Sequence, residues 1–531
     1  MATMDSALLR PMAYGGRWFY LLFGALLAAF ATLIYLYARL YIEGHQLTGL
    51  GNQSAIWGIT VANIIHLIAI SHVGIAVSAF VRIFSIQRLK QFARIAEMIT
   101  IVALPTAVLN IAMDVGRPER FIVNTFWFGR WQSPMVWSMT VISVYFTASA
   151  VYLYLALRRD LALCAERVPH RRWLYKLLAL GYTDTEQERR THERVLWWLA
   201  LIILPIMVSV HSVYGMIFGV TAAKAGWYNP LQSPYFVLGA IVTGFAALIL
   251  IAALLAKVYG WRDFMSPLAF RWLAIVLGFV TFLYIYFYTS EIIVGIYGWP
   301  KAEHEVTHSV ILGRFGWLFW PNVIVGYLLP FAILFVVFVS RTWGRILSLT
   351  PLIIAAALLL VSTWIGRFLI VIPTYFEPRL PYQIQPYFPT VFEWAITFFS
   401  YAFAITFFVV LLKLIPVLEF PQGPAPEIRK EFTLRLPFQE VSQGAKNAIL
   451  LLTVLVGTSL VAQGLYAGVT GPGRPEGGAS AMWVIGLLIL LTLPLTLCLI
   501  RAKPAAAWRG ADPEEFGPPQ VSEMNPPSIT T

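Results

Sequence analysis

Residues 58–82 read GITVANIIHLIAISHVGIAVSAFVR, an apolar stretch long enough to cross a bilayer that still carries His66 and His72. A transmembrane helix needs about 20 mostly apolar residues, and an ionisable side chain in hydrocarbon costs several kcal/mol unless it is paired, hydrated or neutral. Other apolar stretches carry ionisable side chains in the same way: Glu97, Asp114, His211, Glu291, Arg367 and Glu393. A chain with this many is expected to do more than anchor another protein.

Composition places the chain among helical polytopic membrane proteins. Of its 531 residues, 59% are hydrophobic and 12% charged, whereas soluble proteins carry about 25% charged residues. The apolar runs reach about 20 residues or more, the length of a membrane-spanning helix. The net charge of +12 comes from loops between these runs, so it does not indicate a nucleic-acid partner. The first run, residues 19–41, is too long for a cleavable signal peptide.

Cysteine and histidine usage limits the redox groups that the chain can hold. Cys164 and Cys498 are its only cysteines, whereas an iron–sulfur cluster or a cysteine-type zinc site needs about four thiolates. The three histidines deep in predicted spans show no haem-binding signature. We therefore expect no metal, haem or iron–sulfur cluster in this chain.

The hydropathy pattern predicts about twelve transmembrane helices, with ends good to about four residues. The predicted spans are 17–41, 58–82, 93–116, 134–157, 195–223, 232–259, 268–298, 315–340, 348–373, 389–416, 446–468 and 481–500. Two of the gaps between them are long, 158–194 and 417–445.

Lys and Arg are concentrated in alternate gaps, which predicts the orientation. One set of gaps is rich in them, as at Arg82, Lys90 and Arg158, whereas the opposite set holds few, such as Arg117 and Lys301. The positive-inside rule then puts both termini in the cytoplasm.

The rise of about 1.5 Å per residue gives the depth of each ionisable group. Asp114, Glu291 and Glu393 are predicted near the outer ends of their spans and Glu97 near a cytoplasmic end. His66, His72, His211 and Arg367 fall in the middle or outer half. This layout suits a site that opens outward, with a proton path crossing inward.

His72 lies in Ser71-His72-Val73-Gly74, where small residues allow close helix packing. A neutral imidazole there could hydrogen-bond a quinone carbonyl or take a quinol proton; the alternative is a hydrogen bond between helices. His66 is six residues away, about 120° around the helix, and is interpreted as structural.

Asp114 stands just before Gly116-Arg117-Pro118 at the end of the third predicted span. Helical spacing places Asn110, Asp114 and Arg117 on one face. Two interpretations stay open. Asp114 pairs with Arg117 and closes the span, or Asp114 accepts a quinol proton with its pKa tuned by Arg117.

The other buried charges also have two interpretations each. Glu97 is either an interfacial acid near Arg94 or a member of a proton path. A buried cation such as Arg367 requires an anion, so a structural ion pair with Glu291 or Glu393 is the preferred interpretation.

Taken in order, these stretches resemble the NrfD/PsrC-type family of quinone-interacting membrane subunits, over about residues 15–418. The matching stretches are Ser71–Gly74 with Ser78-Ala79, Arg94–Thr100, Val115–Pro118 with Arg120-Phe121, Ser133-Pro134, Ser209–Ser212, Ser233–Phe236, Tyr288–Glu291, Gly366–Phe368 and Pro389–Trp394. The ten-span members, as in alternative complex III and in molybdopterin or sulfur-metabolism complexes, are the most similar.

The resemblance implies a domain organisation. Residues 58–223 and 232–373 would each form a four-helix bundle, preceded by an N-terminal segment with the first span (1–57) and followed by a tenth span (389–416). Residues 446–500 would add a helical hairpin that ten-span members lack, and 501–531 a disordered cytoplasmic tail.

The resemblance also implies a function. Menaquinone or ubiquinone would bind near the outer face of the bacterial inner membrane, at His72, Asp114 and Arg117. Electrons would pass to or from a periplasmic ferredoxin-like iron–sulfur subunit, in a complex with a molybdopterin or multihaem subunit. The segment 117–133, with Phe126, Trp127, Phe128 and Trp131, would form part of the docking surface.

The sequence thus predicts a membrane subunit of a respiratory oxidoreductase complex that is not catalytic alone. His72 and Asp114 would handle quinone protons, and Glu97, His211, Glu291 and Arg367 would extend a path for proton translocation. The alternative is a secondary transporter, because twelve spans with both termini inside is a common transporter layout. The position of the long gap, between spans four and five, and the lack of paired interrupted helices disfavour it. Membrane lipid is the only other expected partner.

Overall fold

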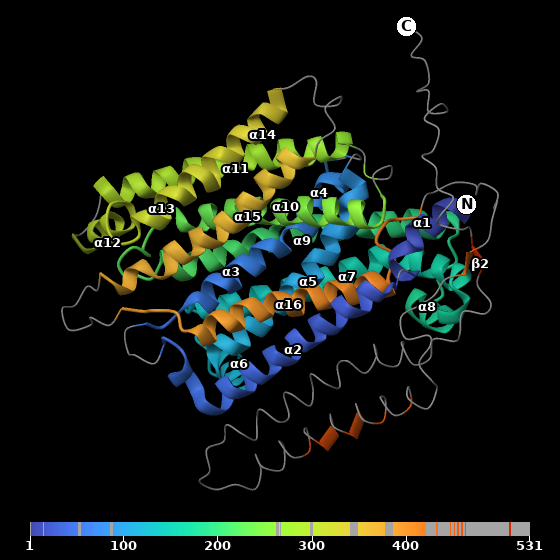
Figure 1. The fold of residues 1–531 in the computed structure, drawn as a ribbon, viewed down its shortest axis with the longest axis horizontal. Helices are drawn as coiled ribbons and strands as arrows, with labels where there is room; N and C mark the ends of the chain where they lie inside the picture. The colour runs from blue at the N-terminus through green and yellow to red at the C-terminus, as the bar shows by residue number, and fades with distance from the viewer. Residues whose placement is uncertain are drawn as a thin grey trace.

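The computed structural model describes residues 2–13, 15–50, 55–84, 86, 89–261, 265, 267–297, 301–339, 349–377 and 386–420, with a few isolated residues beyond them. Apart from one pair of two-residue strands, the fold of these residues is all-α (Figure 1). Ten helices of the described part are long and apolar enough to cross a membrane, and they coincide with the first ten predicted spans. The predicted hairpin 446–500 and tail 501–531 lie almost entirely outside the described residues.

The helices alternate between long spans and short connecting segments. Those of the N-terminal half are α1 (Ala2–Ala13), α2 (Arg17–Glu43), η1 (Gly44–Leu47), α3 (Ile59–Ser71), α4 (Val73–Arg82), α5 (Lys90–Val115), α6 (Pro118–Trp127), α7 (Pro134–Arg167), η3 (Pro169–Arg171), α8 (Arg172–Ala179) and α9 (Glu186–Gly219). Those that follow are α10 (Gln232–Val258), α11 (Pro267–Tyr297), α12 (Lys301–Ile311), α13 (Gly316–Val323), η4 (Ile324–Leu328), α14 (Leu329–Val339), α15 (Thr350–Val371), η5 (Pro373–Tyr375) and α16 (Val391–Leu414). Two two-residue strands, β1 (Phe432–Thr433) and β2 (Arg509–Gly510), pair antiparallel.

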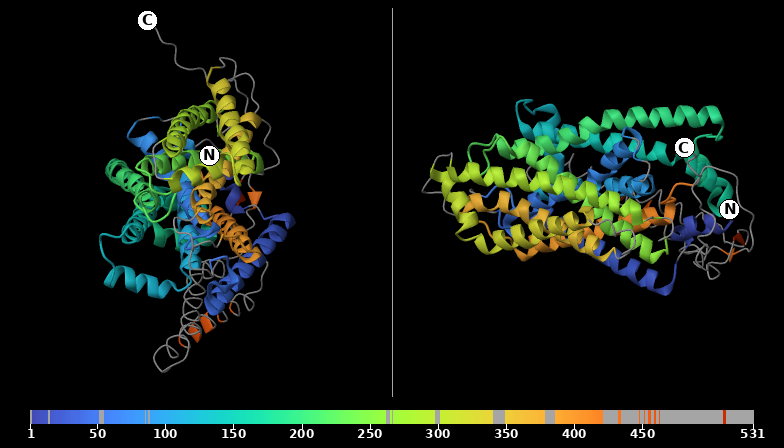
Figure 2. Two further views of the ribbon diagram at one scale, coloured as in Figure 1. Left: turned by 90° about the vertical axis from the view of Figure 1, so that its left-hand side faces the viewer. Right: turned by 90° about the horizontal axis from the view of Figure 1, so that it is seen from above.

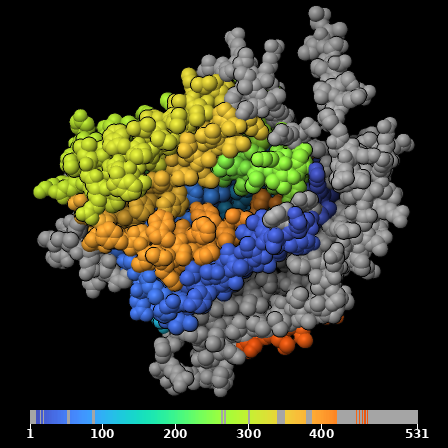
Figure 3. All heavy atoms as spheres, in the orientation of Figure 1, coloured from blue at the N-terminus to red at the C-terminus, as the bar shows by residue number. Residues whose placement is uncertain are grey.

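Two groups of four spans can be followed in the packing. α3–α4, α5, α7 and α9 pack around one another and are called the first bundle; α10, α11, α13–α14 and α15 are called the second bundle. α10 joins them, because it packs against α3 and α9 as well as α11 and α15. α16 packs against α2 and α5, and α2 and α16 run side by side across the face seen in Figure 3.

The long helices run roughly in one direction, so the molecule has two ends (Figure 2). The basic end carries Arg82, Lys90 and Lys257, together with α1 and α8. The opposite end carries the last turns of α5 and α11 and the first turn of α16. The positions of these helix ends support the predicted depths of the ionisable groups. Asp114, Glu291 and Glu393 share the opposite end, and Glu97 lies toward the basic end. Which end faces the cytoplasm stays a prediction.

A break at His72 divides the second span into α3 and α4. The carbonyl of Ser71, at this break, accepts hydrogen bonds from the hydroxyls of Thr100 and Tyr145. Thr100 Oγ1 also accepts the N–H of Gly74 at 3.1 Å, and a Cβ at Gly74 would lie 2.3 Å from that oxygen. A kink in a membrane helix survives when side chains satisfy the freed backbone groups, as they do here.

The long predicted gap 158–194 is more helical than expected. α7 continues to Arg167, α8 fills part of the gap, and α9 already begins at Glu186. The Thr185 side chain accepts the N–H of Glu188 and caps α9, which also has acids in its first turn. Caps and first-turn acids stabilise a helix in water, so the spans extend past the apolar residues that the prediction followed.

Candidate functional site

The predicted site residues His72 and Asp114 do not lie together. His72 is level with Thr100 of α5, because Thr100 bonds to the backbone on both sides of it. Asp114 is fourteen residues further along α5, which corresponds to about 21 Å. The structure therefore separates a buried imidazole near the middle of the first bundle from a carboxyl group at its opposite end.

Arg117 is not on the same helical face as Asp114. Gly116 adopts φ +72° and ends α5, so the chain turns and Arg117 becomes the N-cap residue of α6. The predicted face assumed that the helix continued through residue 117. Within the described residues Arg117 forms no ion pair with Asp114, and the charged group whose field acts on Asp114 is Glu393. Both predicted roles of Arg117, tuning the pKa of Asp114 and closing the span, required an Arg117–Asp114 contact that the described residues do not form.

Asp114 lies in a group of polar side chains from several elements. Its field acts on Tyr214, Tyr375 and Tyr387, and the ring of His45 bonds to its backbone. Asp114 Oδ1 is buried and has no hydrogen-bond partner among the described residues. Hydrogen-bonding a buried acceptor is the rule in proteins, so an unpartnered carboxyl oxygen marks a place where a ligand can donate.

In Glu393, by contrast, both carboxylate oxygens accept hydrogen bonds. It forms a capping box with Thr390 at the start of α16. Its carboxylate also accepts the N–H of Gly49 at 2.9 Å and the hydroxyl of Tyr387 at 2.6 Å. These donors hold the α16 terminus against the loop before α3, so Glu393 is a structural acid and not a partner of Arg367.

His72 forms the interhelical hydrogen bond that was one of its two interpretations. Its Nδ1 lies 2.8 Å from the carbonyl oxygen of Ile68, and its Nε2 lies 2.9 Å from that of Met207 and 3.1 Å from Nδ1 of His211. A neutral imidazole has one N–H and can donate to only one of these carbonyls. A proton added to His72 would let both nitrogens donate, so both carbonyl oxygens would then interact favourably with the charged ring.

Arg367 does not form the predicted ion pair with Glu291 or Glu393. Its guanidinium lies over the ring of Phe236, 4.1 Å from the centre, and 5.6 Å from that of Tyr235. Cation–π contacts thus replace the expected carboxylate, which Glu393 cannot provide. Nε and Nη1 of Arg367 have no partner in the described part of the chain.

Glu291 lies near Arg367 at the opposite end of the second bundle. It accepts a short hydrogen bond from Gln232 Nε2 and interacts with Arg367 through its field. A cavity of about 100 Å³ lies beside it, lined also by Tyr288 and Glu303. The hydroxyls of Tyr235, Tyr284 and Tyr327 form a row next to it, 2.7 and 3.3 Å apart.

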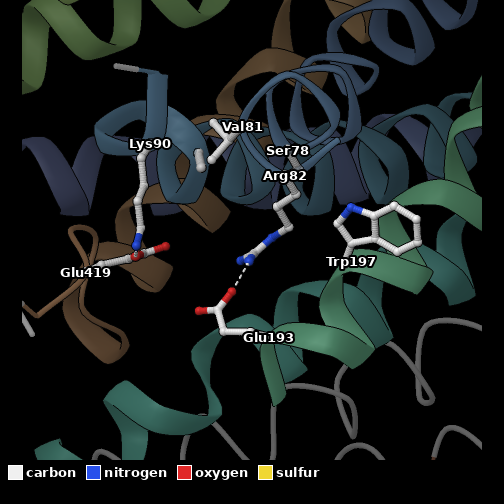
Figure 4. A pocket seen from close by; sticks show the side chains of 8 residues that line it. Ser78, Val81, Arg82, Lys90, Glu193, Trp197 and Glu419 are labelled. Atoms are coloured by element: carbon white, nitrogen blue, oxygen red, sulfur yellow. Dashed lines mark hydrogen bonds and ion pairs between the residues drawn. The ribbon is translucent and has the colours of Figure 1, made fainter. Parts of the chain in front are cut away.

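A larger cavity, of about 240 Å³, opens at the basic end (Figure 4). Ser78, Arg82, Lys90, Glu193 and Glu419 contribute to its wall. Glu97 lies behind it, because the Ser78 hydroxyl donates to Glu97 Oε1 at 2.9 Å. A cavity of this size has room for several water molecules.

The aromatic residues of the predicted docking segment are exposed at the opposite end. Phe126, Trp127, Phe128 and Trp131 are each exposed by half or more, and α6 is in contact with α5 and α7. They lie within about twenty residues of Asp114 along the chain.

Several residues of these groups were missed in the sequence. His45, Gln232, Tyr327 and Glu419 stand outside the stretches that carried the resemblance, and only their packing reveals them. Among the described residues, no three His, Cys, Asp or Glu side chains gather as a metal site would require.

The fold defines an all-α polytopic membrane protein that carries ionisable side chains buried among its helices. The chain matches the family described as Polysulphide reductase, NrfD, over residues 49–378, and it belongs to that family.

Three relatives give the family context. A selenate reductase subunit of Mesobacillus selenatarsenatis is 24% identical over 411 residues, covering 73% of this chain and 92% of that protein. The Hdr-like menaquinol oxidoreductase integral membrane subunit of Archaeoglobus fulgidus is 27% identical over 415 residues, covering 74% and 92%. A protein of Halobacterium salinarum, provisionally named as a membrane subunit of dimethyl sulfoxide reductase, is 30% identical over 207 residues, which cover 39% of this chain and less than half (45%) of that protein. All three are named as subunits of reductases or oxidoreductases, and none of them as a transporter.

Proposed function

We propose that this chain is the quinone-reactive membrane subunit of an oxidoreductase complex, and that quinone or quinol binds beside Asp114. The observation that carries the proposal is the buried Oδ1 of Asp114, at the opposite end of the first bundle, which has no hydrogen-bond partner among the described residues. An unsatisfied buried acceptor costs about 1–3 kcal/mol, and a quinol hydroxyl would supply the missing donor. The name of the A. fulgidus relative supports menaquinol as the quinol.

The surroundings of Asp114 suit a quinone headgroup. Tyr375 accepts the N–H of Trp57 at 3.1 Å, which leaves its own O–H able to donate to a carbonyl. Glu393 is a like charge near Asp114, so a neutral Asp114 relieves repulsion between them. A carboxyl group in such a place can take a proton from a quinol oxygen and pass it on.

Oxidation of a quinol releases two protons and two electrons, and the protons need a different carrier from the electrons. Asp114 would take the protons in turn toward the outer face. The electrons would leave to an iron–sulfur protein, because two cysteines cannot hold a cluster. The exposed aromatic residues of segment 117–133 would be covered by that protein, and a molybdopterin or multihaem subunit would complete the complex.

A row of buried polar groups supports proton translocation as a second part of the proposal. Starting from Glu97 near the basic end, Thr100 lies one turn further along α5 and bonds to the carbonyl of Ser71, next to His72. His72 contacts His211, whose Nε2 is unpartnered within the described residues and which lies in the field of Arg367. The tyrosine hydroxyls and Glu291 continue the row to the opposite end. In this arrangement His72 belongs to the proton path and Asp114 to the quinone.

The positive-inside rule supports a cytoplasmic basic end in a bacterial inner membrane, with the Asp114 end facing the periplasm.

The test is Asp114→Asn in the complex purified with its partner subunits. General acid–base groups contribute about 10²–10⁴-fold, so quinol turnover should fall at least 100-fold while the subunits still co-purify. Glu305→Gln is the matched control, because Glu305 is a surface acid whose ion pair is with Lys301 on the same helix, α12. Unchanged turnover in Asp114→Asn would remove Asp114 from the reaction.

A further inference from the structure

Glu97 is the one acid of a charged cluster at the basic end that is not bonded to a cation, within the described residues. Its side chain is almost fully buried in α5. Oε1 accepts the hydroxyl of Ser78, and Oε2 has no partner in the described part of the chain. Because Ser78 lines the 240 Å³ cavity, Glu97 lies one side chain away from space that water can enter.

Each of the three cations of the cluster is already paired with an acid other than Glu97. Arg82 Nη1 lies 2.9 Å from Glu193, and Arg94 Nη2 lies 2.8 Å from Asp160. Lys90 Nζ lies 3.4 Å from Glu419 (Figure 4). Glu419 also lies 3.9 Å from Arg94. The cluster therefore contains three cations and four acids, and three of the acids neutralise the cations.

The charged and titratable groups that face this cluster come from every element around it. They are Ser78 and Arg82 of α4, Lys90 and Arg94 of α5, Tyr152, Arg159 and Asp160 of α7, His192 and Glu193 of α9, and Glu419 after α16. Arg159 is itself paired with Asp184, which lies outside the cluster. Lys257, the charged residue of α10, is exposed, and Lys413 of α16 lies over the ring of Phe19. With three cations already matched, the fourth acid is the one that can carry a proton.

Glu419 differs from the other acids because it is supplied by a strap, residues 415–420, that crosses the basic end after α16. Arg159 Nη1 donates to the carbonyl of Phe420 at 3.2 Å, and the guanidinium of Arg167 lies 4.4 Å from the centre of the Phe420 ring. These contacts hold the strap on α7 and fix Glu419 against α5. The strap lies beyond residue 378, where the family match ends.

The strap acid is ionised at neutral pH. Burial acts to raise the pKa of Glu419, but Arg94, Lys90 and Arg82 outweigh it and hold the pKa below its ordinary value. Glu419 therefore offers a fixed negative charge to the two cations beside it.

We propose that Glu419 is a positioning residue for proton transfer: by engaging Lys90 and Arg94, it keeps these cations from fixing Glu97 as a carboxylate. Glu97 can then bind a proton from the cavity and release it toward Thr100. This inference rests on the proton path proposed above. It makes proton entry depend on the segment that connects α16 to the C-terminal part of this chain.

The test follows the protonated carboxyl band of Glu97 by infrared difference spectroscopy during a pH titration of the full chain, in proteoliposomes without quinone. The band is identified by its loss in Glu97→Gln. In Glu419→Gln the uncompensated cations should favour the carboxylate, and the midpoint should move about one unit to lower pH. Lys90→Gln should move it to higher pH, and Lys90→Gln with Glu419→Gln together should restore it.

Glu166→Gln is the matched control, because Glu166 is an exposed acid at the same end of α7. An unshifted midpoint in both Glu419→Gln and Lys90→Gln, or a shift as large in Glu166→Gln, would overturn the inference. The absence of a Glu97 band in the wild-type chain at every pH would do so as well. Since no quinol is present, failure of quinol turnover in Asp114→Asn or of proton translocation is a separate result.

Discussion

The two bundles each carry an acid near the opposite end of their second helix, but the surroundings of these acids differ. In the first bundle one carboxyl oxygen of Asp114 has no partner in the described part of the chain, and Asp114 faces a like charge, Glu393. In the second bundle Glu291 accepts a hydrogen bond from Gln232 and lies in the field of Arg367. An acid without a fixed donor suits exchange with a mobile ligand, whereas an acid with fixed partners suits a relay. The same helix position can therefore serve two tasks.

The middle of the two bundles differs in the same sense. The first bundle holds two imidazoles in contact, His72 and His211, at a helix break that side chains satisfy. The second bundle holds a fixed cation, Arg367, on aromatic faces beside a row of tyrosine hydroxyls. An imidazole can exist with or without its second proton, whereas a guanidinium always keeps its charge, so the expected role of Arg367 is to set the electrostatic field.

The largest expected effect separates the two acids. Asp114→Asn should abolish quinol turnover, whereas Glu291→Gln should leave turnover within about twofold and lower the protons moved per quinol at least tenfold. Quinol oxidation is measured by absorbance and proton movement by a pH-sensitive dye in proteoliposomes. Equal loss of turnover in both variants would mean that the two bundles share one task.

Arg367→Met tests the fixed cation of the second bundle. Proton movement should fall about tenfold, because the field that favours ionised Glu291 is lost. Arg367 is held by aromatic faces and by a hydrogen bond from Nη2 to the Phe236 carbonyl at 3.4 Å. Replacing buried charges with apolar side chains is often neutral for stability, so the melting temperature should stay close to that of the wild type. Arg172→Met, at an exposed position of α8, is the control. Normal proton movement in Arg367→Met would leave the cation a purely structural role.

Gly74→Ala tests the helix break of the first bundle. The added methyl group would lie 2.3 Å from Thr100 Oγ1 and 3.0 Å from the Ala96 carbonyl, so the free energy of unfolding should fall by about 2–3 kcal/mol. Gly24→Ala in α2 is the control, since nothing lies within 4 Å of its Cβ position. Chemical denaturation in detergent measures both. If Gly74→Ala is as stable as Gly24→Ala, the helices at the break can move apart at little cost, which would contradict the prediction.

The smallest expected effect concerns the segment that covers the basic end of the first bundle. Burial, reinforced by Arg171, lowers the pKa of His170 to about 4. Between pH 6.5 and 4 the unfolded segment takes a proton that the folded one does not, so stability is lost as pH falls through this window. At pH 5 the loss is at most about 2 kcal/mol relative to pH 7.5. His170→Asn should flatten the pH dependence of the melting temperature over this range, and an unchanged slope would contradict the prediction.

Much of the fold could be predicted from the sequence, because its signals are local. Apolar runs gave the first ten spans, and the alternation of Lys and Arg gave the shared end of Asp114, Glu291 and Glu393. The family resemblance, carried by short stretches in order, is confirmed over residues 49–378. The predicted site residues could not be assembled in the same way. Arg117 does not share a helical face with Asp114, because the chain turns at Gly116. Arg367 packs against aromatic rings where the sequence predicted a carboxylate.

By itself the sequence determined that this chain crosses a membrane many times with ionisable groups inside it, because the cost of apolar surface and of charge depends on composition along a single helix. Only the tertiary structure decided which of those groups meet. The contacts of His72 with His211, Glu393 with Gly49, and Glu419 with Lys90 join residues that are 139 to 344 positions apart in the sequence. Such pairings depend on how helices pack and where they end, and no local pattern of residues records either.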